Sequence, residues 1–149
     1  MSNPTAGDDL IDLVVRLPRA TVVESIKDAR HREHRSQSER LTIAKAILAS
    51  RRRRNERFVG VHFSDPAWDM ILELYVAAAE NRQLRVSKLC SLAGTPKTTA
   101  FRHLEDLELR GFLVRVDDPG DGRSTLAVMQ PALERAMNEW LEGFVAEVG

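Results

Sequence analysis

Apolar side chains recur at helical spacing in four stretches of the chain, residues 37–55, 67–80, 97–110 and 132–148. Ser36 and Glu39 have the spacing of a capping box, which predicts that the first helix begins at about residue 37. Asp65 followed by Pro66 is typical of a capped helix start, and Pro131 stands at the start of the last stretch. The sequence therefore predicts four main helices.

Shorter signals lie between these helices. Residues 84–86 can form a short strand, and Ser87 is expected to cap a short helix that Gly94 ends. After Gly111, residues 112–118 and 123–129 are two strand-like runs, and the Pro-Gly-Asp-Gly sequence between them suits a turn. These two runs predict a β-hairpin.

The stretch from residue 95 to residue 112 combines a buried side with a bare one. On a helical wheel its apolar residues fall together and its polar residues fall opposite. The apolar set is Ala100, Phe101, Leu104 and Leu107, and the polar set is Thr98, Thr99, Arg102 and Asp106. A short helix, a tight turn, a second helix and a hairpin follow one another in the order of a winged helix-turn-helix.

The predicted fold is thus mainly α (α+β), with a winged helix-turn-helix domain and flanking N- and C-terminal helices. We expect an N-terminal arm over residues 1–35, a helix over 36–57, the winged domain over 58–130 and a C-terminal helix over 131–149.

Charge is sorted along the chain although the formal net charge is zero. Residues 82–103 carry basic side chains and no acidic one, and residues 58–81 are acidic. Such sorting can serve nucleic-acid binding on one face. The cations of 82–103 are Arg82, Arg85, Lys88, Lys97 and Arg102.

The second helix of a helix-turn-helix pair enters the major groove of DNA, and its first residues meet base edges. Arg102 suits a guanine edge or a phosphate, while Thr98 and Thr99 suit a phosphate or a thymine methyl group. The alternative is a solvated helix face without a ligand. The predicted DNA-binding residues of the helix are Lys97, Thr98, Thr99 and Arg102.

A run of four arginines, Arg51, Arg52, Arg53 and Arg54, stands at the end of the first predicted helix. Cations at a helix C-terminus are favoured by the helix macrodipole without any partner. Contact with DNA phosphates is an equally good interpretation, and the sequence leaves both open.

The sequence TPKTTAFRHLEDLELRGFLVRVDDPGDGRSTLAVM, residues 95–129, resembles the recognition helix and wing of MarR-type winged-helix transcription regulators. The helix motif and the wing motif are more specific together than either is alone, and the resemblance covers about residues 66–130. The matching features are Thr98, Thr99 and Arg102, Leu107-Glu108 before Arg110-Gly111-Phe112, then Arg115, and the wing tip from Asp118 to Arg123.

This resemblance implies a sequence-specific regulator of transcription that binds double-stranded DNA. The recognition helix over 96–110 would lie in the major groove, and the wing over 113–129 would lie on the adjacent minor groove or backbone, with Arg123 and Ser124 as its DNA-binding residues. It also implies a homodimer joined by its N- and C-terminal helices, with room for a small-molecule effector between them and the DNA-binding lobe. The alternative is a winged-helix module for protein interaction or an accessory, architectural DNA-binding protein.

Other classes of function find little support in the sequence. Cys90 is the only cysteine, so one chain can form neither a disulfide nor a thiolate metal cluster, and we expect it to be a buried structural thiol. The histidines show no metal-ligand spacing, and no catalytic triad or phosphate-binding loop stands out, so no enzyme, metal or cofactor is predicted. Without a membrane-spanning run or a signal pattern, a cytoplasmic location is expected.

Overall fold

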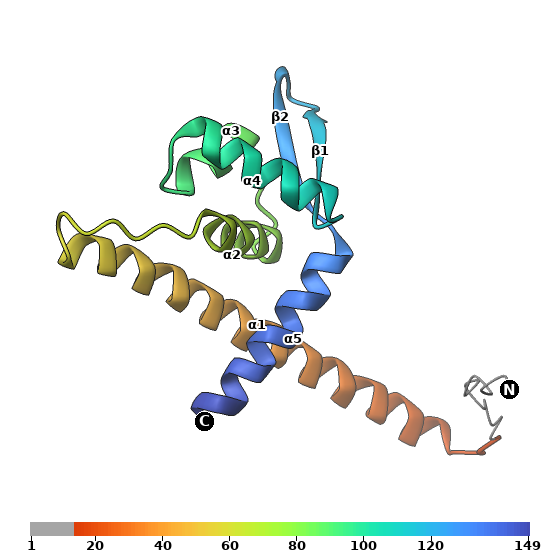
Figure 1. Ribbon diagram of the computed structural model, residues 1–149. Helices are drawn as coiled ribbons and strands as arrows, with labels where there is room; N and C mark the ends of the chain where they lie inside the picture. The colour runs from red at the N-terminus through yellow and green to blue at the C-terminus, as the bar shows by residue number, and fades with distance from the viewer. Residues whose placement is uncertain (1–13) are drawn as a thin grey trace, which may run out of the picture. The chain divides into compact units, whose positions relative to one another are not determined.

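The computed structural model describes residues 14–149. Along these residues it has α1 (Arg19–Arg57), α2 (Pro66–Ala79), α3 (Val86–Leu92), α4 (Lys97–Leu109), β1 (Leu113–Asp118), β2 (Asp121–Met129) and α5 (Pro131–Val148) (Figure 1). The strands β1 and β2 pair antiparallel as a hairpin, from Leu113 opposite Met129 to Asp117 opposite Thr125. The predicted fold class is confirmed: the chain is mainly α, with a winged helix-turn-helix between flanking helices.

The boundary between two compact units lies between Arg35 and Ser36. In the first unit the described residues 14–35 include the start of α1 and expose several apolar side chains, Val14, Val15, Leu17, Val22, Val23 and Ile26. The helix predicted to begin at about residue 37 begins at Arg19. Residues 20–35 contain neither Gly nor Pro to interrupt a helix, so the capping-box spacing of Ser36 and Glu39 falls inside one.

Three further local predictions differ from the structure. Asp65 does precede α2, but its side chain makes no capping hydrogen bond. The helix α3 begins at Val86 with Arg85 in the capping position, so Ser87 is not its cap. The strand predicted over 84–86 is reduced to a single bridge between Arg85 and Leu126, because only the amide of Ala127 reaches the carbonyl oxygen of Leu84, at 2.8 Å.

The core of the second unit is built around α2. Every residue from Leu72 to Ala77 is buried, and α2 packs against α3, α4, β2 and α5. A helix that is apolar around its whole circumference is stable only when neighbours cover all of it. The largest fully buried side chains of the unit are Met70, Leu72, Leu74, Leu89, Leu104, Leu113, Leu133 and Leu141.

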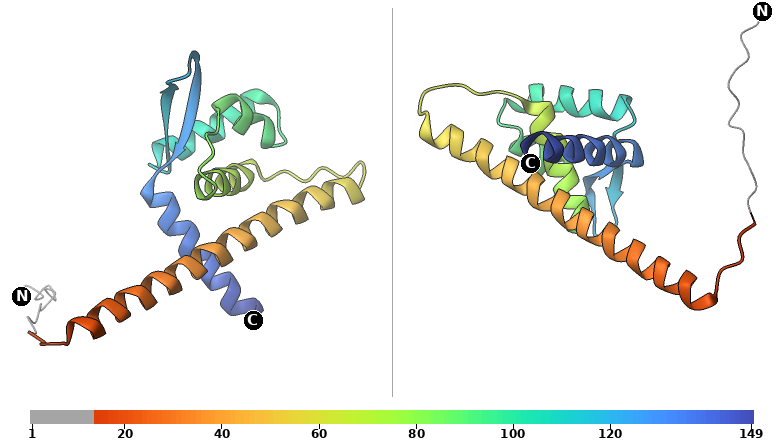
Figure 2. Two further views of the ribbon diagram at one scale, coloured as in Figure 1. Left: turned by 180° about the vertical axis from the view of Figure 1, so that it is seen from behind. Right: turned by 90° about the horizontal axis from the view of Figure 1, so that it is seen from below.

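The helix α5 crosses the part of α1 that belongs to this unit (Figure 2). At this crossing Arg40 of α1, only 6% exposed, donates from Nη1 to Oε1 of Glu142 in α5 at 3.1 Å. One helical turn before Glu142, the Asn138 side chain accepts a hydrogen bond from the Tyr75 hydroxyl at 2.8 Å, and burial raises the pKa of that hydroxyl. These polar contacts fix how α5 lies against α1 and α2, since each buried donor needs its partner.

The helix α4 allows a matched test of what holds it in place. Leu104→Ala, in the core at 0% exposed, should lower the free energy of unfolding by about 2 to 5 kcal/mol, because it leaves a cavity. Leu109→Ala, on the same helix but 87% exposed, should change it by less than about 0.5 kcal/mol. Urea unfolding followed by circular dichroism measures both, and equal effects of the two changes would contradict the described packing.

Candidate nucleic-acid interface

The turn between α3 and α4 sets where the second helix begins. Gly94 has φ of +68°, a left-handed conformation that favours glycine and ends α3. Pro96 then takes the capping position, and α4 starts at Lys97, one residue after the start predicted from the sequence. Because Pro96 contributes no amide hydrogen, the chain leaves the turn in a direction that a continuous helix could not take.

The helix α4 buries one side and exposes the other, as predicted. Ala100, Leu104 and Leu107 are buried in the core, whereas the predicted DNA-binding residues of the helix are all exposed. Those residues are Lys97, Thr98, Thr99 and Arg102. Within residues 14–149 no carboxylate lies within 4 Å of the Arg102 guanidinium, so its donors remain available to a ligand.

The wing tip is held by its own acidic residues. Asp118 is 8% exposed and accepts a hydrogen bond from the backbone amide of Gly120 at 2.9 Å. Asp121 accepts from the backbone amide of Arg123 at 3.1 Å. Since these contacts use main-chain donors, the exposed Arg123 guanidinium is not needed to close the turn. In the part of the chain described, it has no carboxylate within 4 Å.

An ion pair between Glu108 of α4 and Arg115 of β1, called here the clip, was not predicted from the sequence. Arg115 donates from Nε and Nη2 to the two carboxylate oxygens of Glu108, at 2.8 and 2.9 Å, and its guanidinium lies 5.4 Å from the ring centre of Phe101. This bidentate contact lowers the pKa of Glu108 and raises that of Arg115. Both residues had matched the family motif, but their mutual contact depends on how the hairpin folds back beside α4.

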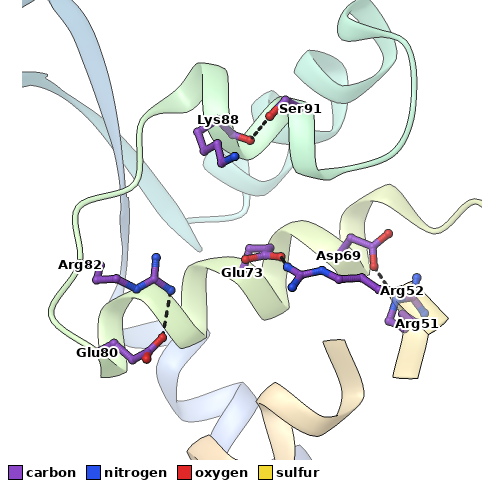
Figure 3. Close-up of polar contacts among 8 residues, drawn as sticks. All are labelled: Arg51, Arg52, Asp69, Glu73, Glu80, Arg82, Lys88 and Ser91. Carbon is purple, nitrogen blue, oxygen red and sulfur yellow. Dashed lines mark hydrogen bonds and ion pairs between the residues drawn. The ribbon is translucent and has the colours of Figure 1, made fainter. Parts of the chain in front are cut away.

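The arginine run turns partly inward. Arg51 donates from Nε to Asp69 of α2, and Arg52 donates from Nη2 to Glu73 of α2 at 2.7 Å (Figure 3). Arg54 stacks over the ring of Phe63 at 4.1 Å, while Arg53 is exposed. The spacing of Asp69 and Glu73, one helical turn apart, is the sequence signal that could have indicated acidic partners for these arginines. Phosphate contact by this run remains a prediction, with Arg53 the member best placed for it.

A polar cleft of about 910 Å³ lies between the end of α1, the middle of α2 and α3. Its cations are Arg52, Arg82, Arg85 and Lys88. The three arginines have carboxylate partners: Arg52 pairs with Glu73 at 2.7 Å, Arg82 with Glu80 at 3.0 Å and Arg85 with Asp118 at 3.7 Å. Lys88 lies in the same cleft (Figure 3), and no carboxylate of residues 14–149 comes within 4 Å of its amine.

The remaining candidate chemistry is sparse in residues 14–149. Cys90 is buried as expected, and burial raises the pKa of its thiol, which disfavours the reactive thiolate. Among these residues no group of three His, Cys, Asp or Glu side chains is arranged to hold a metal ion. No helix in the same range is both long and apolar enough to cross a membrane.

The comparison with protein families decides which kind of winged helix this is. Residues 63–124 match the model of the MarR family. The winged-helix segment of the chain belongs to the MarR family. The match includes α2, α3, α4, β1 and the start of β2, and so contains the exposed face of α4, the Glu108–Arg115 clip and the tip of the wing.

Solved structures resemble this chain more loosely. A probable transcriptional regulator from Pseudomonas aeruginosa is 25% identical over 72% of this chain and 75% of its own, with a TM-score of 0.45. MepR of S. aureus in complex with DNA is 13% identical over 84% and 85%, with a TM-score of 0.48. PcaV from Streptomyces coelicolor with its natural ligand is 21% identical over 70% and 71%, with a TM-score of 0.44. No curated protein matches the chain.

If the clip positions α4 relative to the wing, its loss should weaken DNA binding more than it lowers the stability of the fold. Glu108→Gln and Arg115→Gln should each lower the free energy of unfolding by less than about 1 kcal/mol, because both side chains are about one-third exposed. Each should weaken DNA binding several-fold, about as much as the double change, because the two residues act as one unit. Exchange of the charges, Glu108→Arg with Arg115→Glu, should recover part of the affinity.

The same pair has a defined pH dependence. The folded-state pKa of Glu108 lies below its ordinary value. The contribution of the pair to the free energy of unfolding is therefore complete when the pH is above the ordinary pKa, and it is lost as the pH falls through the folded-state pKa. Urea unfolding measures the stability of the variants, and fluorescence anisotropy with labelled duplex DNA measures their affinity for DNA. Additive losses in the double variant would contradict a shared contact.

Proposed function

We propose that this protein is a sequence-specific DNA-binding regulator of transcription that acts as a homodimer in the cytoplasm. The exposed face of α4, the recognition helix, reads the major groove, and the wing contacts the adjacent minor groove or backbone through Arg123 and Ser124. The observation that carries the proposal is the bare polar face of α4 beside a projecting wing, within the segment that matches the MarR family. MepR, one of the looser structural likenesses, was solved in complex with DNA.

Both DNA-contacting elements offer cations that the fold does not use. Arg102 lies in the second turn of α4, where recognition helices meet base edges. Arg102 can donate two parallel hydrogen bonds to a guanine edge, a geometry that lysine cannot reproduce. Arg123 lies at the tip of a hairpin that projects away from α5 (Figure 1). Arg102 would then read a base edge, and Arg123 would position the protein on the DNA backbone.

The exposed apolar surface of α5 supports the proposed dimer. On α5, Trp140 is 45% exposed, Val145 43% and Val148 71%, which is more apolar exposure than a helix facing water needs. The ring of Trp140 stacks on Phe144 and meets Trp68 edge to face, so Trp140 belongs to an aromatic cluster that joins α5 to α2. A second copy of the chain would cover this surface, and its two-fold symmetry would place two α4 helices against a palindromic site.

Replacement of Arg102 tests the assignment directly. Arg102→Ala should lower the affinity for the preferred sequence by about 1 to 3 kcal/mol and relax the choice of base at one position in each half-site. Arg110→Ala is the matched control, because Arg110 lies at the end of the same helix and already pairs with Asp106 at 2.9 Å. Selection from a random duplex pool, followed by anisotropy at two salt concentrations, gives sequence preference and affinity.

The same experiment separates the alternatives. Two chains should bind each selected duplex, as measured by analytical ultracentrifugation of the complex. A pool without any enriched sequence would reject a regulator. Unselective but salt-sensitive binding would indicate an architectural protein, and no binding at all would indicate a module for protein interaction.

We also propose that the polar cleft beside α2 takes a small anionic effector. Lys88 supplies an uncompensated charge, and Leu84 and Leu92 line the same cleft, so a carboxylate on a compact apolar body fits its chemistry. With benzoate as the probe, isothermal titration should show binding that Lys88→Ala weakens at least about 5-fold. Lys27→Ala, which removes an exposed lysine that does not line the cleft, should leave the affinity unchanged. Equal affinities for all three proteins would reject the site.

A further inference from the structure

An acidic side chain stands on the face of α4 that the proposed function assigns to DNA. Thr98, Arg102 and Glu105 are related as i, i+4 and i+7, so they share one face of the helix, and all three are exposed. The buried residues Ala100 and Leu104 lie on the other side. A carboxylate that faces DNA is repelled by the phosphates, so its presence on this face needs a separate explanation.

The structure does not use Glu105 in an ion pair. The nearest cation of the hairpin, Arg115, is held by both carboxylate oxygens of Glu108. Arg110, the next cation along α4, pairs with Asp106. Within residues 14–149 no basic group lies within 4 Å of the Glu105 carboxylate. Of the three acidic residues in α4, Glu105, Asp106 and Glu108, Glu105 alone forms no ion pair within 4 Å, and its only recorded interaction is a through-space attraction to Arg115.

The major groove presents a small set of donors that such a carboxylate can accept from. An ionised carboxylate is an acceptor only, and the amino group of cytosine is the donor that Glu and Asp commonly recognise there. Arg102 and Glu105 are three residues apart, a rise of about 4.5 Å along the helix, which spans between one and two base-pair steps of about 3.4 Å. Donor and acceptor side chains thus face neighbouring base pairs.

We propose that Glu105 is a specificity-determining residue that accepts a hydrogen bond from a cytosine amino group within two base pairs of the site read by Arg102. This inference rests on the proposed function, because it places α4 in the major groove. Glu105 acts in two ways. It selects cytosine at one position, and it lowers affinity for every sequence that offers no amino group to offset its repulsion from the phosphates.

Charge removal without change of shape is the test. Glu105→Gln keeps one acceptor oxygen and adds donors, a combination that suits adenine. In selections from a random duplex pool, the wild-type protein should enrich cytosine at one position in each half-site. Glu105→Gln should reduce that preference at least about 5-fold, admit adenine there and leave the other positions unchanged. Its affinity for a duplex lacking the selected sequence should rise several-fold.

Asp106→Asn is the matched control, since it removes a charge from the adjacent position that is already paired with Arg110. It should leave the selected sequence unchanged. Glu105 is exposed, so both variants should unfold at the wild-type urea concentration, which excludes a folding defect.

The outcomes separate this inference from the function on which it rests. If the wild type selects a sequence and Glu105→Gln selects the same one at every position, Glu105 has no role in specificity and the regulator stands. If Asp106→Asn relaxes the same position as Glu105→Gln, the effect is general to negative charge on α4, and the inference is wrong. A wild type that selects no sequence overturns both proposals.

Discussion

The burial of α2 around its whole circumference is the constraint on which the rest of the second unit depends. Between Leu72 and Ala77 no side chain faces water, so α1 and α5 must cover one side while α3, α4 and β2 cover the other. The polar side chains of this buried helix then require hydrogen-bond partners. Arg52 donates to Glu73, which is 8% exposed, and Asn138 accepts from the Tyr75 hydroxyl. One helix thereby connects the DNA-binding helices to those that flank them.

This arrangement explains how the cations are divided. Arg51 and Arg52 lie within a strongly basic stretch, yet both donate to carboxylates of α2 and so neutralise charge close to the core. Arg102 lies in the acid-free basic stretch of residues 82–103 and Arg123 lies in the wing, and the described fold gives neither of them a carboxylate partner within 4 Å. The density of basic residues in the sequence does not by itself identify the surface that attracts a polyanion. What matters is which carboxylates the fold brings within reach.

The sequence predicted those elements whose cause is local. Pro66, Gly94 and the Pro-Gly-Asp-Gly turn each act through the backbone within a few residues, and α2, the end of α3 and the hairpin follow. The buried side of α4 was predicted for the same reason, because helical periodicity is a local property. Errors arose where a local signal competed with its surroundings: Ser36 has a capping pattern but lies within a helix that nothing upstream interrupts. The clip between Glu108 and Arg115 depends on tertiary approach, and no local rule contains it.

The clip also explains why α4 and the wing can act as one reading surface. A helix anchored only by Ala100, Leu104 and Leu107 could still rotate about its axis against an apolar core, since such contacts are not directional. A bidentate guanidinium–carboxylate contact is directional, and it joins the outer side of α4 to β1. The spacing between the major-groove side chains and the wing tip is then set by the fold before DNA arrives, so less ordering is required on binding. Because Glu108 holds Arg115 with both carboxylate oxygens, Glu105, one turn earlier, is attracted to Arg115 only through space and forms no ion pair within 4 Å in the described residues, so the contact that fixes the reading surface also shapes its charge.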